Sequence, residues 1–452
     1  MNPQSMFPSD DDVGTMTDLY QLTMAAGYFA NGLHRRRACF EAFVRVLPPN
    51  RSYLIFAGLE QVLHYLTHLR FTEDQINWLR KQRAFANVPP DFFEYLRKLR
   101  FTGEVWAMPE GTVFFPGEPV LRVTADLLQA QLVETYVLTC MSFQTLVASK
   151  AARIVSAARG RAVVDFGARR AHGPQAGLLA ARAALIGGCT GTSYVEAARR
   201  LGAPAVGTQA HSWIMSFDDE QEAFLRYARI FGPHTVCLID TYDTITGAHR
   251  ATAVGSDLLG VRLDSGDLLA LSKQVRRILD EAGLTRAKIL ASGDLNEFRI
   301  ADLLAGGAPI DMFGVGTEMA TSVDAPALSL VYKLVESQDA SGRMVPRSKL
   351  SSDKATLAGV KQVYRSYDPA GKMRQDLLTL AEEEAPGVPL LQPILRDGQI
   401  QEEPPGVEAI ARRTRSQLET LPDSLRTLHG SAPFPVALSE RLVRHQPTAH
   451  AI

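Results

Sequence analysis

The sequence predicts an α/β protein: an irregular βα barrel with a smaller α+β domain built from N- and C-terminal segments. Two observations predict the barrel. Short apolar stretches alternate with amphipathic helical stretches in the middle of the chain, and each apolar stretch ends in glycine or polar residues. A third observation predicts the smaller domain, because short apolar runs interrupted by Gly and Pro lie both before and after the barrel region.

The chain divides into successive segments. The polar start, residues 1–13, is expected to be a flexible tail, and TDLYQLTMAAGYF then has apolar residues at helical spacing. Near the other end, LSLVYKLVES and KQVYRSYDPAGKMRQDLLTLAEEE are typical of strands joined by a turn at DPAGK. The predicted limits are 14–126 and 326–430 for the two parts of the smaller domain, 127–325 for the barrel with the active site, and 431–452 for a loose tail.

The barrel region is expected to begin with a long helix over 127–158, followed by six strands. Helix signals separate most of the strands. Ser193 and Glu196 have the spacing of a capping box, and Gly202 follows as a stop. Because active sites gather at the carboxyl ends of barrel strands, the polar residues there predict one convergent pocket. The predicted strands are AVVDFG (162–167), APAVGTQA (203–210), TVCLIDTY (235–242), GVRLDSGD (260–267), KILASGD (288–294) and DMFGVGT (311–317).

The charge balance and the cysteine usage exclude several classes of protein. With 48 basic and 49 acidic residues, nothing favours nucleic acid or an anionic membrane, whereas a small anionic substrate needs only a few local arginines. The first residues lack the apolar core of a signal peptide, and no apolar run is long enough to span a bilayer. The four cysteines are widely separated, so neither a zinc site nor a disulfide framework is indicated, and a cytoplasmic setting is expected.

Two glycine-containing strand ends predict phosphate binding. Gly314-Val-Gly316-Thr317 exposes backbone N–H groups that can surround an anion, and Ser292-Gly293 precedes another helix. Two successive loops of this kind are a common phosphate site in barrels. The alternative is that each is only a tight structural turn, and the full Gly-x-Gly-x-x-Gly dinucleotide pattern follows none of these strands.

Basic and acidic side chains are expected at the same face. Arg262 lies on a strand and would be a costly buried cation without an anion, so it is a candidate to bind a carboxylate or phosphate, with Asp264 accepting hydroxyls. Aspartates here can also hold Mg²⁺ that bridges a pyrophosphate. The alternative for Arg262 is an internal salt bridge with an aspartate.

Phe166 and the tandem arginines after it form a further candidate group. Arg169 or Arg170 can clamp an anion bidentately, and Phe166 can stack on a flat ring. The alternative is a solvated basic loop.

His211, in GTQAHSW, follows a predicted strand. A histidine at such a place is often structural, but beside phosphate loops it can act as a general acid or base, or as a nucleophile that accepts a phosphoryl group. The pattern around Tyr20, on the N-terminal helix, favours a core position.

Taken together, these motifs resemble one family. TDLYQLTM, FGARRAHGP, GTQAHSW, GVRLDSGDL, GVGT and VYKLV occur in the order and spacing of nicotinate phosphoribosyltransferase, over residues 14 to 400. The resemblance implies the type II phosphoribosyltransferase fold. It also implies transfer of a phosphoribosyl group from 5-phosphoribosyl 1-pyrophosphate (PRPP) to nicotinate, yielding nicotinate mononucleotide and pyrophosphate in NAD salvage. The resemblance further implies that Mg²⁺ is required, that ATP is a co-substrate, and that the protein is a homodimer with the active site at its interface.

The resemblance also implies roles for individual residues. His211 would be the phosphorylated histidine, and Asp264 would face ribose hydroxyls or magnesium. The implied nicotinate contacts are Thr208, Arg262, Phe166, Arg169 and, from the partner subunit, Tyr20; the implied PRPP contacts are Ser292, Gly293, Gly314, Gly316 and Thr317. Relatives carry Asn-Asn in some cases where Gly293-Asp294 stands here. No fixed protein metal site is implied, since Mg²⁺ arrives with PRPP or ATP.

Three other interpretations stay open at this point. Nicotinamide phosphoribosyltransferase has the same fold and reaction class, but the arginines near the ring pocket favour an acid over an amide. A different barrel enzyme acting on sugar phosphates, such as an aldolase or isomerase, often needs a barrel lysine or a metal cluster. A catalytically silent protein would bind PRPP without ATP-dependent turnover.

Overall fold

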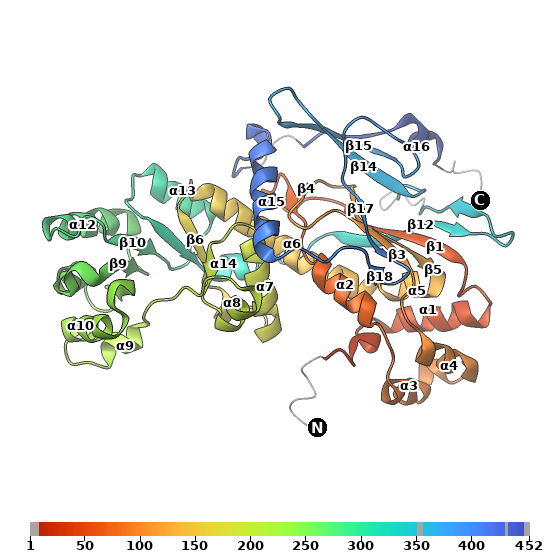
Figure 1. Ribbon diagram of the computed structural model, residues 1–452, viewed down its shortest axis with the longest axis horizontal. Coiled ribbons are helices and arrows are strands. Elements are labelled where there is room, and N and C mark those ends of the chain that lie inside the picture. The colour runs from red at the N-terminus through yellow and green to blue at the C-terminus, as the bar shows by residue number, and fades with distance from the viewer. Residues whose placement is uncertain (1–8, 350–355, 430–432, 447–452) are drawn as a thin grey trace. The chain divides into compact units, whose positions relative to one another are not determined.

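The computed structural model describes residues 9–349, 356–429 and 433–446, and Figure 1 shows its ribbon. The chain forms two compact units. The first contains Met1–Thr145, Ala327–Pro405 and Ser416–Ile452, and the second contains Leu146–Pro326 and Gly406–Arg415. Residues 127–145, which the sequence assigned to the barrel, thus group with the first unit.

The second unit is built on a curled sheet of six parallel strands, a half-barrel. The strand order is β7-β6-β11-β10-β9-β8, and each neighbouring pair is parallel. Successive parallel strands need crossover connections, which the helices of this unit supply (Figure 1). The mixed α/β class predicted from the sequence is therefore confirmed. The strands are β6 (Ala162–Asp165), β7 (Gly191–Thr192), β8 (Thr235–Leu238), β9 (Leu258–Leu263), β10 (Lys288–Ala291) and β11 (Met312–Val315).

Polar caps set where four of these helices begin. The side chains of Asp219, Asp243, Asp267 and Asn296 accept hydrogen bonds from first-turn N–H groups of α10, α11, α12 and α13, respectively. Such caps satisfy N–H groups that have no acceptor within the helix. The helices are α7 (Pro174–Ile186), α8 (Val195–Leu201), α9 (His211–Met215), α10 (Glu220–Phe231), α11 (Thr244–Ala251), α12 (Leu268–Glu281), α13 (Glu297–Ala305) and α14 (Thr317–Ala320).

The first unit joins segments from both ends of the chain in one sheet. Its seven strands run in the order β13-β12-β1-β5-β3-β17-β18, and β1 pairs antiparallel with both β12 and β5. Phe40 of β1 stacks on Tyr332 of β12 with ring centroids 5.0 Å apart, within an extensive apolar core. The predicted C-terminal strands are confirmed as β12 and as the hairpin β14–β15, which turns at 368–372.

The strands of the first unit are β1 (Arg37–Val44), β2 (Leu54–Ile55), β3 (Glu104–Ala107), β4 (Val113–Phe114), β5 (Pro119–Asp126), β12 (Leu330–Gln338), β13 (Met344–Pro346), β14 (Lys361–Tyr367), β15 (Met373–Leu380), β16 (Val388–Pro389), β17 (Gln392–Arg396), β18 (Gln399–Ile400) and β19 (Val436–Leu438). Its helices are α1 (Leu19–Ala30), α2 (Leu59–His68), α3 (Glu73–Arg80), α4 (Pro90–Lys98), α5 (Leu127–Leu132) and α16 (Glu440–Arg444). Two further helices, α6 (Glu134–Ala157) and α15 (Val407–Thr420), have residues in both units.

Several local predictions were wrong. The segment 203–210 is a loop with a single β-bridge at Ala205, because it is largely exposed and has no buried apolar face. His211 therefore begins α9 and does not end a strand. The capping box at Ser193 does not form, since α8 begins after Tyr194, although the helix does stop at Gly202 in the left-handed region (φ 61°).

The ends of the chain are partly described. Residues 433–446 form β19 and α16, so this part of the predicted loose tail is ordered. Residues 1–8, 431–432 and 447–452 of the two predicted tails lie outside the described residues. Within the described part of the chain, no helix is both long and apolar enough to span a membrane.

Candidate functional site

Three side chains at the carboxyl ends of β8 and β9 and in the loop before α9 hold buried polar atoms without a hydrogen-bond partner among the described residues. These atoms are Nε of Arg262, Oδ1 of Asp240 and both amide atoms of Gln209. The three residues are neighbours, because Arg262 Nη2 donates to the Gln209 carbonyl at 3.1 Å and the charge of Asp240 acts on Arg262. Buried polar atoms are almost always paired, so this group, called here the Arg262 cluster, points to a polar ligand.

Arg262 does not form the internal salt bridge with an aspartate that was the alternative interpretation of the sequence. Within the described residues it forms no salt bridge, and its one hydrogen bond goes to a backbone carbonyl. Burial lowers the pKa of Arg262; Asp264 and Asp240 oppose this effect, and Arg169 adds to it. A partly buried guanidinium without a carboxylate is a favourable place for an anion.

Asp264 is held by its neighbours on both sides. Its backbone N–H donates to Asp240 Oδ2 at 2.9 Å, and Ser292 Oγ donates to Asp264 Oδ1 at 2.5 Å. Gly293 lies directly against it: a Cβ at this glycine would be 2.0 Å from the Asp264 carbonyl oxygen, and its φ is +89°. Only glycine fits such a conformation and close approach. The main structural role of Ser292 and Gly293 is therefore to position Asp264.

His211 lies in the same loop region. Its Nδ1 is 3.1 Å from the Thr241 hydroxyl oxygen, and Thr241 directly follows Asp240. In the tautomer in which Nδ1 donates to Thr241, the lone pair is on Nε2. The imidazole is half-buried and therefore both oriented and accessible.

Phe166 follows β6 and packs over β11. A Cβ on Gly314 would come within 2.5 Å of two ring atoms of Phe166, so the missing side chain of Gly314 makes room for this ring. Gly314 is a buried residue of β11, not a loop residue. Asp165 fixes the turn before the ring, accepting from Gly167 N–H at 2.8 Å and from Thr192 Oγ1 at 2.7 Å, and burial raises its pKa.

A buried lysine links the two predicted phosphate loops. Lys150 of α6 is only 1% exposed, and its Nζ lies 2.8 Å from Glu297, the first residue of α13. The same Nζ is 3.6 Å from Glu318 of α14 and 3.0 Å from Asp324. Lys150 therefore links the beginnings of α13 and α14, and each of these helices follows one of the two predicted loops.

The remaining predicted site residues are Gly316, Thr317, Thr208, Arg169 and Tyr20. Gly316 precedes α14 and Thr317 begins it, exposed at the surface. Among the residues that the structure describes, the Thr208 hydroxyl donates only to the neighbouring carbonyl of Gln209, and Arg169 is exposed. Tyr20 belongs to the first unit and is 49% exposed, so the core position favoured by its pattern is wrong.

Sequence reasoning missed three residues of this region. Gln209 and Asp240 both stand in strand-end or loop motifs that were noted, but nothing local shows that their side-chain atoms are buried and unpaired. Lys150 is in the middle of a helix, where a charged residue normally faces solvent. Only its buried partners, distant in sequence, distinguish it.

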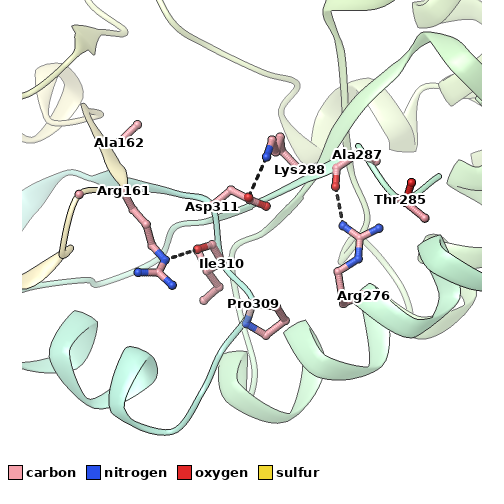
Figure 2. Close-up of a pocket in the computed structure, with 10 residues that line it drawn as sticks. Arg161, Ala162, Arg276, Thr285, Ala287, Lys288, Pro309, Ile310 and Asp311 are labelled. Carbon is pink, nitrogen blue, oxygen red and sulfur yellow. Dashed lines mark hydrogen bonds and ion pairs between the residues drawn. The ribbon is translucent and has the colours of Figure 1, made fainter.

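A hollow lies at the opposite, amino-terminal ends of the strands (Figure 2). Its volume is about 420 Å³, and Arg161, Lys288 and Asp311 at the starts of β6, β10 and β11 help to line it. Arg161 donates to the Ile310 carbonyl at 2.8 Å, and Lys288 pairs with Asp311 at 3.1 Å. These groups are already paired, and no predicted site residue lines this hollow.

The fold and the site define an α/β protein with a polar, anion-compatible site at the carboxyl ends of parallel strands. The sequence models for the N-terminal domain, the family core and the C-terminal domain of nicotinate phosphoribosyltransferases match residues 15–142, 161–338 and 387–446. The chain therefore belongs to the nicotinate phosphoribosyltransferase family.

Individual relatives agree with this assignment. A nicotinate phosphoribosyltransferase of Mycobacterium tuberculosis is 46% identical over 96% of this chain and 95% of its own length. That of Bacillus subtilis is 44% identical over 83% of this chain and 78% of its own. The crystal structure of human nicotinic acid phosphoribosyltransferase matches with a TM-score of 0.83 at 30% identity, covering 95% of this chain and 98% of the human one.

Proposed function

We propose that this protein is a nicotinate phosphoribosyltransferase that joins nicotinate and PRPP in NAD biosynthesis, with ATP hydrolysis coupled to the reaction through a phosphohistidine. The Arg262 cluster is the observation that carries the proposal. The family membership and the names of the relatives support it.

Nicotinate is a flat ring with a carboxylate, and the predicted site residues of the second unit match it in chemistry. Arg262 offers a guanidinium fork for the carboxylate, with Arg169 as a second nearby positive charge. Phe166 offers an aromatic face, and Thr208 a hydroxyl. A neutral amide such as nicotinamide gains less from two cations, which favours the acid as substrate.

In the transfer step, the pyridine nitrogen attacks C1 of the ribose and the bond from C1 to pyrophosphate breaks, its electron pair leaving with pyrophosphate. The transition state resembles an oxocarbenium ion, so positioning and electrostatics contribute more than a strong base. Asp264 faces the ribose hydroxyls, while Ser292, Gly293, Gly316 and Thr317 belong to the loops that hold the phosphates. Gly314, in β11, instead makes room for the Phe166 ring. The Asp240 and Asp264 carboxylates fit the oxygen preference of Mg²⁺, which neutralises pyrophosphate charge when bound with PRPP.

His211 Nε2 is the proposed nucleophile toward ATP. Its lone pair attacks the γ-phosphorus, the bond to the bridging oxygen breaks, and ADP leaves with that electron pair. Thr241 orients the ring through Nδ1. Water then hydrolyses the phosphohistidine, so the free energy of ATP hydrolysis can favour mononucleotide formation.

We further propose a cytoplasmic homodimer in which Tyr20 completes the partner's nicotinate site. The exposed ring of Tyr20 supports this arrangement. Mixing inactive Tyr20→Ala and His211→Ala proteins tests it: heterodimers contain one intact site, so partial activity should return. Mixtures as inactive as the separate variants would exclude a shared site.

The enzymatic proposal is tested by measuring mononucleotide formation from nicotinate, nicotinamide and quinolinate, each with and without ATP. We expect nicotinate to be preferred and ATP to increase the yield. In parallel, γ-labelled ATP should label the wild type and not His211→Ala. Preference for another base would contradict the substrate, and equal labelling of both proteins would remove His211 from its role.

A further inference from the structure

Two histidines and an aspartate gather on the surface of the first unit, and none of them is among the predicted site residues. His64 and His68 are four residues apart on α2, so they share one face of the helix. Asp10 joins them from the N-terminal segment. One possible ligand atom from each residue lies within 4.8 Å of the other two.

The backbone hydrogen bond of His68 leaves its Nε2 free to bind a metal. His68 Nδ1 is 2.8 Å from the His64 backbone carbonyl, which can only accept, so Nδ1 carries the proton and Nε2 holds the lone pair. The two rings stack with centroids 4.1 Å apart. A backbone acceptor on one ring nitrogen is the usual way in which a metal-binding histidine is oriented.

Asp10 is the carboxylate of this segment that bonds to the histidines. Asp11 is paired with Arg70 at 2.6 Å, and Asp12 accepts from both the N–H and the hydroxyl of Ser9. Asp10 Oδ1 is 2.8 Å from His64 Nε2. Both side chains are about half exposed, at 56% and 50%, so ions in solution can reach them.

We infer that Asp10, His64 and His68 form a binding site for a divalent transition-metal ion of the zinc type. On binding, the His64 proton moves from Nε2 to Nδ1, and the metal takes its place between Nε2 and Asp10 Oδ1, with His68 as the third ligand. Two imidazoles and one carboxylate suit Zn²⁺, Ni²⁺ or Cu²⁺, whereas Mg²⁺ prefers oxygen ligands. The metal would fasten the N-terminal segment to α2 and is independent of the Mg²⁺ of the proposed reaction.

The test uses the full chain, freed of metal with a chelator and titrated calorimetrically with Zn²⁺ in excess Mg²⁺. We expect one Zn²⁺ per chain and a higher melting temperature, because the ion binds the folded state. His64→Ala, His68→Ala and Asp10→Asn should each weaken binding about tenfold or more, since even outer-shell changes at metal sites cost that much. His249→Ala, an exposed histidine of the second unit, is the matched control and should bind like the wild type.

The outcomes separate clearly. Asp10 and His64 are exposed and His68 is half-buried at the surface, so the variants should fold, and circular dichroism checks this. No saturable Zn²⁺ binding, or equal binding by the wild type and the triple variant, would overturn the inference. Loss of binding in the three variants only, with nicotinate mononucleotide formation unchanged, would support it.

Discussion

Replacing Arg262 by Met tests whether this arginine serves a ligand or the fold. Methionine keeps most of the volume and removes the charge. The substitution loses one hydrogen bond to a carbonyl, worth about 1.5–3 kcal/mol for a charged donor. It also relieves the cost of partly burying an unpaired cation, which is several kcal/mol for a fully buried ion. The two effects nearly cancel, so the free energy of unfolding should change by less than about 2 kcal/mol.

Catalysis should respond quite differently. Truncating one partner of a buried contact between a guanidinium and a carboxylate typically costs about 2–5 kcal/mol. This loss corresponds to a fall in kcat/KM for nicotinate of about 30-fold to several thousand-fold. Arg277→Met, at an exposed position on α12, is the matched control and should leave both quantities unchanged. Steady-state kinetics with thermal and urea unfolding measure the two effects.

The opposite pattern would refute the reasoning. Had Arg262 been half of a structural ion pair, its loss would destabilise the protein by about 3–5 kcal/mol and affect all substrates through unfolding. A strongly destabilised Arg262→Met protein with near-normal kcat/KM for nicotinate would therefore exclude the proposed role.

Three further predictions follow from other contacts. Lys150→Met removes one of the two cations that pair with buried Glu297 and leaves Arg153, so it should destabilise the protein by about 1.5–3 kcal/mol in urea unfolding; where folded, it should raise KM for PRPP more than KM for nicotinate, and equal changes would show that Lys150 does not act on the phosphate loops. Gly293→Ala places a methyl group against the Asp264 carbonyl at a positive φ, which should cost at least about 1–3 kcal/mol and most of the activity; a fully active variant would contradict the tight approach. Because burial raises the pKa of Asp165 above its ordinary value of 3.8, the unfolded state loses this proton at lower pH, and the wild type should lose stability as pH rises from 3.8 through the raised pKa. Asp165→Asn should lack this part of the pH dependence in unfolding measurements, and an unchanged profile would contradict it.

Regular features of the fold were predictable because they depend on local pattern. Five of the six expected barrel strands formed, since each is a short apolar run that can be buried on both faces. The sixth, 203–210, failed because Pro204, Gly207 and their exposed neighbours give it no face to bury. Its loop conformation nevertheless brings Gln209 to Arg262.

The site was predictable only in outline. Polar strand ends indicated where chemistry would gather, and the motifs indicated which family the residues belong to. The sequence could not show that Arg262 lacks an ion pair or that Ser292 bonds Asp264, because both depend on contacts between segments far apart in the chain. Gly314 shows the same limit: a glycine expected to face phosphate instead makes room for the Phe166 ring.

The most direct test of the account is a crystal structure with nicotinate mononucleotide bound. The account predicts that the carboxylate lies on Arg262, the ring against Phe166 and the phosphate at the loops before α13 and α14. A nucleotide in the hollow at the amino-terminal ends of the strands (Figure 2), with the Arg262 cluster untouched, would contradict it.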